Sequence, residues 1–272
     1  MHMGKIKNIR NVVITGSEGY VGENLSQFLI DKHLGVFLFD NDLGSEFAVE
    51  NLNAMGTNMD FIIHLASFPG IINCTLDFDR AVIENISSAF NIFRLAYNQK
   101  IPVIFTSSQA AKEPYDNLYA SIKRIIEVEA DRLNRLGADI RVFRLTNIYG
   151  GYKYLEKKNT VVKKFVLARR SKKPLVINGD GSQVRDFIHV NDVCEAMYQC
   201  MLREKGFLSP VDIGSGKGVS IVELANMVGG ELTFLPESDT IGISRSVANP
   251  GAAQRLFGFT AKHELSDYLR KE

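Results

Sequence analysis

Short apolar runs alternate with longer amphipathic segments along the first half of the chain. The runs are nearly continuous in Val, Ile, Leu and Phe, which predicts strands over Asn11–Thr15, Val36–Asp40, Asp60–His64, Pro102–Ser107 and Ile140–Leu145. Continuous apolar strands are typical of a parallel sheet that is covered on both faces. Helical periodicity between them predicts helices over Val21–Lys32, Phe78–Gln99 and Tyr119–Leu136. This alternation indicates a doubly wound α/β fold.

The pattern changes after Gly150. A tyrosine- and lysine-rich stretch is followed by a predicted helix near Val161–Arg170 and by glycine-rich turns at Asn178–Ser182 and Gly214–Gly218. We therefore expect a doubly wound domain over residues 1–150 and a small α/β part over residues 151–272. Residues 186–205 are expected to pack back on the first domain.

Composition narrows the possible classes of protein. The 272 residues are 45% hydrophobic and 23% charged, as in globular proteins, and the net charge of +1 provides no general attraction to nucleic acid or anionic membranes. No apolar run approaches the roughly 20 residues of a membrane span, and no secretory signal is evident. Cys74, Cys194 and Cys200 are too widely spaced to suggest a disulfide framework or a zinc site. A reducing cytoplasm is the expected location.

A glycine-rich turn connects the first predicted strand to the first predicted helix. Its glycines have GxxGxxG spacing, and its candidate cofactor-binding residues are Gly16, Glu18, Gly19, Tyr20, Val21 and Gly22. Glycine allows the backbone to approach a pyrophosphate, whose charge a helix N-terminus favours. The alternative is a simple tight turn, but the order of strand, glycines, helix and strand favours dinucleotide binding and a Rossmann-like domain.

Two further strand ends extend this candidate site. Asp40 lies 24 residues after Gly16, near the ~20 typical of a ribose-binding acid, and would repel a 2′-phosphate, so NAD is favoured over NADP. The alternative is a solvated turn residue beside Asn41 and Asp42. At the end of the third strand, Leu65, Ala66 and Ser67 are candidates for close contact with the dinucleotide, whereas His64 is expected to be a core histidine.

Candidate chemistry follows the fourth strand, which ends in serines. Tyr119 and Lys123 are four residues apart on one helix face. A lysine ammonium and an oxidised nicotinamide would both lower the tyrosine pKa, as acid–base work near neutrality requires. Ser108 is placed to hydrogen-bond the same substrate oxygen.

The YxxxK spacing also occurs at two other places in the chain, at Tyr149/Lys153 and Tyr154/Lys158. Neither of these pairs lies on a strongly amphipathic helix after a serine-ending strand. We expect both tyrosines to be surface residues of a Gly- and Lys-rich loop.

Together these residues resemble the extended short-chain dehydrogenases/reductases of the NAD-dependent sugar-nucleotide epimerase/dehydratase family. The resemblance runs from about Asn11 to Leu269 and includes Asn85, an additional cofactor-binding candidate. Beyond the glycine motif and the Tyr119/Lys123 pair, the matching segments are Phe61–Ser67, Arg144–Gly150, Asn178–Asp192, Asp212–Gly216 and Ala248–Gly258. Asn178–Asp192, with the pattern N-G-D-G-x-x-x-R-D-F-I-H-V-x-D, is the most specific.

The resemblance implies roles for individual residues. Tyr119 would be the catalytic acid/base, Lys123 would bind the nicotinamide ribose and lower the tyrosine pKa, and Ser108 would position the reacting hydroxyl. Asn147 and Arg185 would face the nucleotide-sugar, and Arg245 is a second phosphate candidate.

The residues assigned to the nucleotide-sugar also have structural alternatives. Arg185 could instead pair with Asp186, and Arg245 could be a solvated loop arginine. Asp186, His189 and Asp192 are expected to be architectural, with Asp192 as a helix cap.

The chain also departs from the family pattern. Only 20 residues separate Asp40 from Asp60, so we expect one βα unit to be missing. Ala111-Lys112-Glu113 replaces the usual V-Y-G after the serines, and Ser108-Gln109-Ala110 lacks the Thr-Asp-Glu set of dehydratases. Epimerisation is therefore favoured over dehydration.

The resemblance predicts an NAD-dependent epimerase of a nucleoside-diphosphate sugar, with C4 as the expected position. Alternatives are a keto-sugar-nucleotide reductase or dehydrogenase, a dehydratase, and a non-catalytic sensor of NAD or nucleotide-sugar. By the same resemblance we expect a homodimer that associates through the helices Phe78–Gln99 and Tyr119–Leu136.

Overall fold

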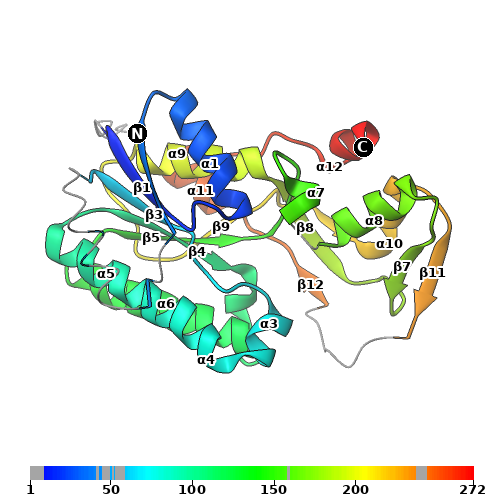
Figure 1. Cartoon of the computed structure of the whole chain (residues 1–272), viewed down its shortest axis with the longest axis horizontal. Helices are drawn as coiled ribbons and strands as arrows, with labels where there is room; N and C mark the ends of the chain where they lie inside the picture. Colours follow the sequence, from blue (N-terminus) through cyan, green and yellow to red (C-terminus); the bar gives the residue numbers. More distant parts are fainter. Residues whose placement is uncertain are drawn as a thin grey trace.

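A six-stranded parallel sheet forms the centre of the larger half of the molecule (Figure 1). The computed structural model describes residues 9–40, 43–44, 50, 52, 59–157, 160–236 and 244–272. The strand order is β2-β1-β3-β4-β5-β9. The strands are β1 (Asn11–Thr15), β2 (Gly35–Phe39), β3 (Phe61–His64), β4 (Val103–Ser108), β5 (Ile140–Leu145) and β9 (Val211–Ile213). The order reverses between β1 and β3, which creates a crevice at the carboxyl ends of these strands.

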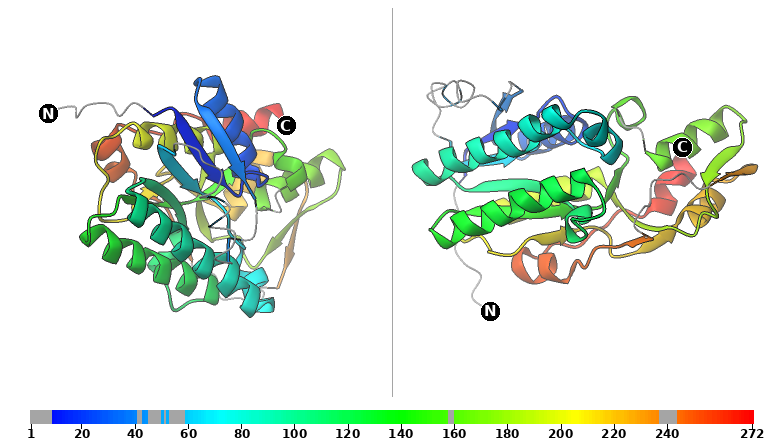
Figure 2. Two further views of the ribbon diagram at one scale, coloured as in Figure 1. Left: turned by 60° about the vertical axis from the view of Figure 1, so that its left-hand side comes forward. Right: turned by 90° about the horizontal axis from the view of Figure 1, so that it is seen from below.

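Helices cover both faces of this sheet, as the continuous apolar strands predicted. One face packs against α1 (Tyr20–Asp31), α9 (Val190–Met201) and α11 (Gly251–Phe257). The other packs against α3 (Ile71–Leu76), α4 (Phe78–Ala81), α5 (Ser88–Gln99) and α6 (Leu118–Arg135), the last two of which lie side by side in Figure 2. Successive strand residues such as Val12 and Val13 belong to different apolar clusters, because their side chains point to opposite faces.

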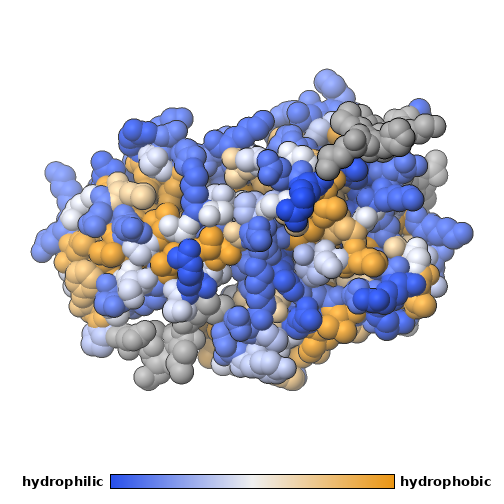
Figure 3. Space-filling model, turned by 180° about the vertical axis from the view of Figure 1, so that it is seen from behind, coloured by the Kyte–Doolittle hydropathy of each residue, from blue (hydrophilic) through white to orange (hydrophobic). Residues whose placement is uncertain are grey.

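The smaller half contains two further sheets. One consists of β6 (Asn147–Tyr149), β8 (Val184–His189), β10 (Gly218–Ser220) and β12 (Arg245–Ser246), and the other of β7 (Leu175–Asn178) and β11 (Leu232–Leu235). The remaining helices are α7 (Tyr154–Lys157), α8 (Val161–Arg170), α10 (Ile221–Val228) and α12 (Leu265–Lys271). Apolar residues are exposed at the end of the molecule that carries β7 and β11, on the left in Figure 3.

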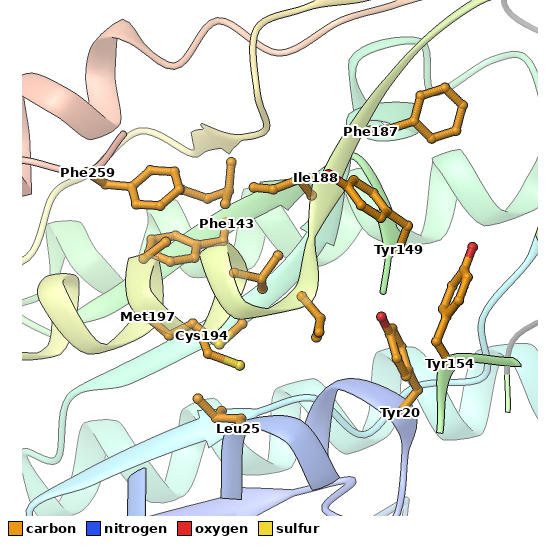
Figure 4. Packing of buried hydrophobic residues seen from close by; sticks show 14 of the residues in the cluster. Tyr20, Leu25, Phe143, Tyr149, Tyr154, Phe187, Ile188, Cys194, Met197 and Phe259 are labelled. Atoms are coloured by element: carbon orange, nitrogen blue, oxygen red, sulfur yellow. The ribbon is translucent and has the colours of Figure 1, made fainter. Parts of the chain in front are cut away.

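The two halves share one hydrophobic cluster, part of which Figure 4 shows. Tyr149 of β6 and Tyr154 of α7 are buried in it, with only 1% and 2% of their surface exposed. The Tyr154 ring lies 5.6 Å from that of Tyr20, and the Tyr149 ring lies 5.3 Å from that of Tyr268. The expectation that Tyr149 and Tyr154 are surface residues is therefore wrong, because α1 and α12 fold over the segment that carries them.

The five strands predicted in the first half are confirmed to within one residue at each end. The helix predicted over Phe78–Gln99 is interrupted by the π-helix η1 (Val82–Ser87) between α4 and α5. Most of the interval between Asp40 and Asp60 lies outside the described residues, so the missing βα unit stays a prediction. Within the ranges that are described, no helix combines the length and apolar character needed to cross a membrane.

Candidate functional site

The glycine-rich turn packs so closely that side chains are excluded from it. Gly16 has φ +71°, and a Cβ there would lie 2.5 Å from the backbone nitrogen of Ala66. A Cβ on Gly22 would lie 2.3 Å from the carbonyl oxygen of Gly16. Gly19 precedes α1 and has no side chain to cap its first turn. The turn therefore leaves the N-terminus of α1 lined by backbone, which fits the pyrophosphate of a dinucleotide.

Asp40, directly after β2, is joined to the glycine-rich turn. Its carboxylate accepts hydrogen bonds from the Ser17 hydroxyl and from the Glu18 backbone nitrogen, the latter at 3.1 and 3.2 Å. Asp40 is exposed, so its carboxylate also remains accessible to a ligand. Asn41 and Asp42, its neighbours in the alternative interpretation, lie outside the described residues.

His64 is a core histidine, as predicted. It is 1% exposed, its Nδ1 lies 2.7 Å from the Thr15 hydroxyl, and its ring stacks on Phe105. Burial, assisted by the positive charge of Lys123, lowers its pKa to about 3, so the ring is neutral near pH 7. The structure gives Nε2 no hydrogen-bond partner among the described residues.

Ser108, Tyr119 and Lys123 come together at the carboxyl end of β4. Tyr119 lies in the first turn of α6, which Asn117 caps by accepting a hydrogen bond from the Ala120 nitrogen at 2.9 Å. Ser108 lies close enough to the Tyr119 side chain to lower its pKa. The Lys123 ammonium lies 5.7 Å from the centre of the tyrosine ring.

Burial moves the pKa values of the tyrosine and the lysine in opposite directions. It raises the pKa of Tyr119 to about 12, although the nearby Ser108 side chain opposes this. It lowers the pKa of Lys123 to about 8, against the influence of Cys74 and Glu127. The sequence suggested a lowered pKa for this tyrosine, but in the free chain the pKa is raised, because loss of solvation is the largest effect.

Lys123 is held on its other side by the segment that follows β3. Its Nζ donates to the Ser67 hydroxyl and to the Thr106 carbonyl, each at 3.2 Å. Ser67 in turn donates to Asn85 Oδ1 at 2.8 Å. This contact connects the cofactor end of the candidate site to its chemical end.

Asn85 lies behind this group and is 2% exposed. Besides Ser67, its amide binds the backbone nitrogen and carbonyl of Phe68, at 3.2 and 3.1 Å, and the Ala81 carbonyl at 2.9 Å. These contacts hold Asn85 behind Ser67 and Lys123, and its role in cofactor binding stays a prediction.

The sequence reasoning missed the position of Cys74. This buried thiol donates to the Phe68 carbonyl at 3.4 Å and influences the pKa values of both Tyr119 and Lys123. No spacing or composition signal marks it, because it reaches the group from α3, far away in sequence.

Asn147 and Arg185 lie on the paired strands β6 and β8. In the register of β6 and β8, Asn147 is opposite Phe187, so Asn147, Arg185 and Phe187 share one face. Asn147 donates to the Asp186 carbonyl at 3.1 Å, and Arg185 donates to the Val184 carbonyl at 2.9 Å.

Asp186 points to the opposite face of β8. Its carboxylate accepts from the backbone nitrogens of Ser215, Gly216 and Ala248, at 2.9, 2.9 and 3.1 Å. The alternative pairing of Arg185 with Asp186 is therefore wrong, because successive strand residues face opposite sides.

Arg245 is on the other face from Arg185. It pairs with Val184 in the register of β12 and β8, and its Nη2 lies 3.4 Å from where a Gly218 Cβ would be. Since Gly218 pairs with Asp186, the arginine lies on the Asp186 side of this sheet. The structure thus does not bring the two arginines together.

Asp192 is not the cap of α9. His189 has that role, since its Nδ1 accepts from the Asn191 nitrogen at 3.1 Å. The Asp192 carboxylate instead accepts from the backbone nitrogens of Lys262 and His263, at 3.1 and 3.0 Å. Asp192 lies in the first turn of the helix, where its side chain reaches the returning chain before α12.

A groove of about 1150 Å³ runs along α1 and α9. Ser17 and Glu18 line one end of it, and Asp192 and His263 line another part. Ser108, Tyr119 and Lys123 are not among its lining residues, so this groove is separate from the candidate catalytic group.

Comparison with known proteins agrees with this arrangement. UDP-glucuronic acid decarboxylase 1 of Arabidopsis thaliana is 26% identical over 80% of this chain, which spans 57% of that relative. dTDP-4-dehydro-6-deoxy-D-allose reductase of Streptomyces bikiniensis is 26% identical over 95% of this chain and 91% of its own.

Solved structures confirm the fold. UDP-glucose 4-epimerase of Thermotoga maritima, bound to UDP-glucose, has a TM-score of 0.86 at 21% identity over 96% of both chains. UDP-glucose 4-epimerase of Thermus thermophilus, in complex with NAD, has a TM-score of 0.84 at 19% identity over 96% of both chains. Residues 12–213 match the family described as NAD dependent epimerase/dehydratase. The chain therefore belongs to the NAD dependent epimerase/dehydratase family.

Proposed function

We propose that this chain is an NAD-dependent epimerase of a nucleoside-diphosphate sugar, acting at C4. The observation that carries the proposal is the placement of Ser108 at the end of β4 and of Tyr119 and Lys123 one helical turn apart on α6, with the Lys123 ammonium held by the Thr106 carbonyl of β4, at the sheet edge that also carries the glycine-rich turn. This arrangement places a proton donor and acceptor beside a pyrophosphate-compatible helix N-terminus.

The cofactor would be held by backbone and by two charged groups. The first turn of α1 would bind the pyrophosphate, Asp40 would accept from the ribose hydroxyls near the adenine, and Lys123 would donate to the other ribose. The exposed carboxylate of Asp40 would repel a 2′-phosphate, which favours NAD over NADP. NAD, when bound, accepts a hydride from the sugar carbon and returns it.

The chain itself supplies proton transfer and orientation. Tyr119 takes the proton of the C4 hydroxyl and later returns it, and Ser108 hydrogen-bonds the same oxygen. Because the pKa of Tyr119 is about 12 in the free protein, additional positive charge near the phenol must assist its deprotonation. The oxidised nicotinamide would provide that charge, beside the Lys123 ammonium that the free protein already holds near the phenol.

The nucleotide-sugar would bind across β6 and β8. Asn147 and Arg185 share the face on which this substrate is placed, and a guanidinium suits a diphosphate because it donates two parallel hydrogen bonds. Arg245 has no part in this proposal, since it lies on the opposite face.

The experiment is to incubate the purified chain with NAD and a panel of UDP-, GDP-, dTDP- and CDP-sugars. Product identity and NADH absorbance are followed together. An epimerase forms the C4 epimer with no net change in NADH. Absence of any epimer over the whole panel would reject the proposal.

A second candidate is a one-way reductase or dehydrogenase of a keto-sugar nucleotide. The similarity to a dTDP-4-dehydro-6-deoxy-D-allose reductase over 95% of the chain favours it. The same experiment separates the two, because this reaction consumes or releases NADH in equal amount to product.

For the assembly, we propose a homodimer that associates through α5 and α6. Ile83, Tyr97, Ile125 and Val128 are between 38% and 55% exposed on this helical layer. Burying such side chains against a second copy would be favourable.

A further inference from the structure

A buried carboxylate lies on α6 below the candidate catalytic group. Glu127 is one helical turn beyond Lys123 and two turns beyond Tyr119, so all three side chains share one face of the helix. Only 1% of the Glu127 side chain is exposed. Neither the family resemblance nor the proposed proton transfer gives this residue a role.

The three side chains meet three consecutive residues at the end of β4. The Thr106 carbonyl accepts from Lys123 at 3.2 Å, the Ser107 hydroxyl donates to Glu127 Oε1 at 2.7 Å, and Ser108 lies close enough to Tyr119 to lower its pKa. The strand end is thereby attached to successive turns of the helix. A shift of this strand end relative to α6 would move Ser108 away from the phenol.

Arg144 of the neighbouring strand β5 completes this attachment. Its Nε lies 2.8 Å from Glu127 Oε1 and its Nη2 lies 2.6 Å from Oε2, while Arg124 contacts Oε2 at 3.2 Å. Arg144 is also the register partner of Ser107. The carboxylate therefore connects α6, β4 and β5 at one point.

Stability alone does not explain such an arrangement. A buried ion pair recovers little more than its cost of desolvation, and apolar residues of similar volume often serve as well. A negative charge near Lys123 also stabilises the charged form of its ammonium. Four titratable groups face the ammonium: His64 from β3, Cys74 from α3, and Tyr119 and Glu127 from α6. Among these four, the carboxylate is that of Glu127.

We propose that Glu127 is a positioning residue for this reaction: it fixes the end of β4 against α6 and keeps the Lys123 ammonium charged beside the phenol. This inference rests on the proposed function, since it assigns Glu127 to the same site. It does not require Glu127 to touch substrate or cofactor.

The pH dependence of NAD binding and turnover tests this role. Burial lowers the pKa of Lys123 to about 8, and the nearby Cys74 and, after it, Glu127 oppose that lowering. NAD affinity and kcat/KM should each have an alkaline limb, that is, a fall at high pH where Lys123 loses its proton. In Glu127→Gln we expect both limbs to move to lower pH by about half a unit or more. Calorimetry measures NAD affinity, and kinetics measures kcat/KM. In Glu129→Gln, which removes a carboxylate paired with Arg132 on the helix surface, both limbs should stay in place.

Glu127→Asp separates charge from geometry. It keeps the negative charge but shortens the side chain, so we expect the limbs to stay near their wild-type positions while kcat falls several-fold. Limbs that coincide for folded Glu127→Gln and wild type would overturn the proposal. If Glu127→Gln does not fold, Ser107→Ala decides, because it removes only the hydroxyl contact: a lower kcat with unchanged KM supports the role, and an unchanged kcat rejects it.

These outcomes can be distinguished from failure of the proposed function. If no nucleotide-sugar is turned over by wild type, the epimerase proposal fails. The pH dependence of the NAD dissociation constant then still tests whether Glu127 controls the charge on Lys123.

Discussion

Tyr119 is partly buried and Lys123 is fully buried, and this loss of solvation makes the phenol harder and the ammonium easier to deprotonate. Their pKa values of about 12 and about 8 leave both side chains mostly protonated at pH 7. The phenol of the free protein therefore carries a proton that it must lose before it can take the proton of the sugar hydroxyl. Release of that proton is coupled to the charge of the bound cofactor, which ties acid–base chemistry to cofactor binding.

Replacement of the catalytic phenol tests the proposed acid–base residue. Tyr119→Phe removes the proton donor and keeps the ring, so turnover should fall about 100-fold to 10,000-fold while NAD binding changes little. Steady-state kinetics and calorimetry measure the two effects. Tyr115→Phe is the control, because Tyr115 is 98% exposed and should leave turnover unchanged. Turnover of Tyr119→Phe within a few-fold of wild type would assign the chemistry elsewhere.

His64 predicts a pH-dependent part of the stability. Its pKa is about 3 in the folded chain and about 6.5 when unfolded, so between these values only the unfolded chain binds the proton. Stability is therefore lost as pH falls through this range, by about 2 kcal/mol at pH 5 relative to neutral pH. His189, with a pKa lowered to about 4, contributes in the same direction.

Urea unfolding at pH 7 and pH 5 measures this effect. In His64→Gln the loss of unfolding free energy between the two pH values should be smaller than in wild type by about 2 kcal/mol. His33→Asn, at an exposed position in a turn, should leave the difference unaltered. An equal pH 5 to pH 7 difference in wild type and His64→Gln would contradict a neutral buried imidazole.

At the scale of elements, the π-helix η1 interrupts a helix that hydrophobic periodicity predicts to be continuous. The pattern over Phe78–Gln99 predicts one continuous helix, yet Asn85 donates to the Ala81 carbonyl and to the Phe68 carbonyl. This local widening lets one amide serve both its own helix and the segment after β3. The sequence identifies a helix here, but the interruption depends on a partner 17 residues away.

The N-terminus of α6 offers a test of how an element positions the site. Asn117→Ala removes the cap and should cost about 1 kcal/mol of stability and also lower kcat, because Tyr119 lies in the first turn. Thr160→Ala removes the corresponding cap of α8. We expect a similar loss of stability there without an effect on kcat. Unfolding experiments and kinetics on both variants check this, and equal kcat values would show that the cap does not position the tyrosine.

At the scale of the whole molecule, exposed apolar residues occur both on the α5/α6 layer and on β7 and β11. Figure 2 shows α5 and α6 forming one continuous face, whereas the second group lies at the far end of the smaller half, as in Figure 3. The proposed dimer uses the first surface.

Sedimentation velocity distinguishes these two surfaces. Ile125→Asp places a charge on α6 and should convert the dimer to monomers, since burying an unpaired carboxylate is costly. Val176→Asp makes the same change on β7, where Val176 is 50% exposed, and should leave the mass unchanged. A monomeric wild-type chain would contradict the proposed assembly.

Much of the larger half could be predicted because its signals are local. Strand runs such as Ile140–Leu145 and the amphipathic face of α6 report burial directly along the chain. Tyr149 and Tyr154 show where this reasoning fails. Their flanking Gly and Lys residues indicate a surface loop, but α1 and α12 bury both rings.

By itself, the sequence determined the order and class of the main elements and put Ser108, Tyr119 and Lys123 at the ends where strands and helices meet. Hydrophobic periodicity and short motifs suffice for this, since they depend on neighbours within a few residues. Only the tertiary structure decided which partners those residues have. Contacts such as Ser67 with Lys123, Glu127 with Arg144 and Asp192 with His263 join elements distant in sequence, and packing alone sets their distances.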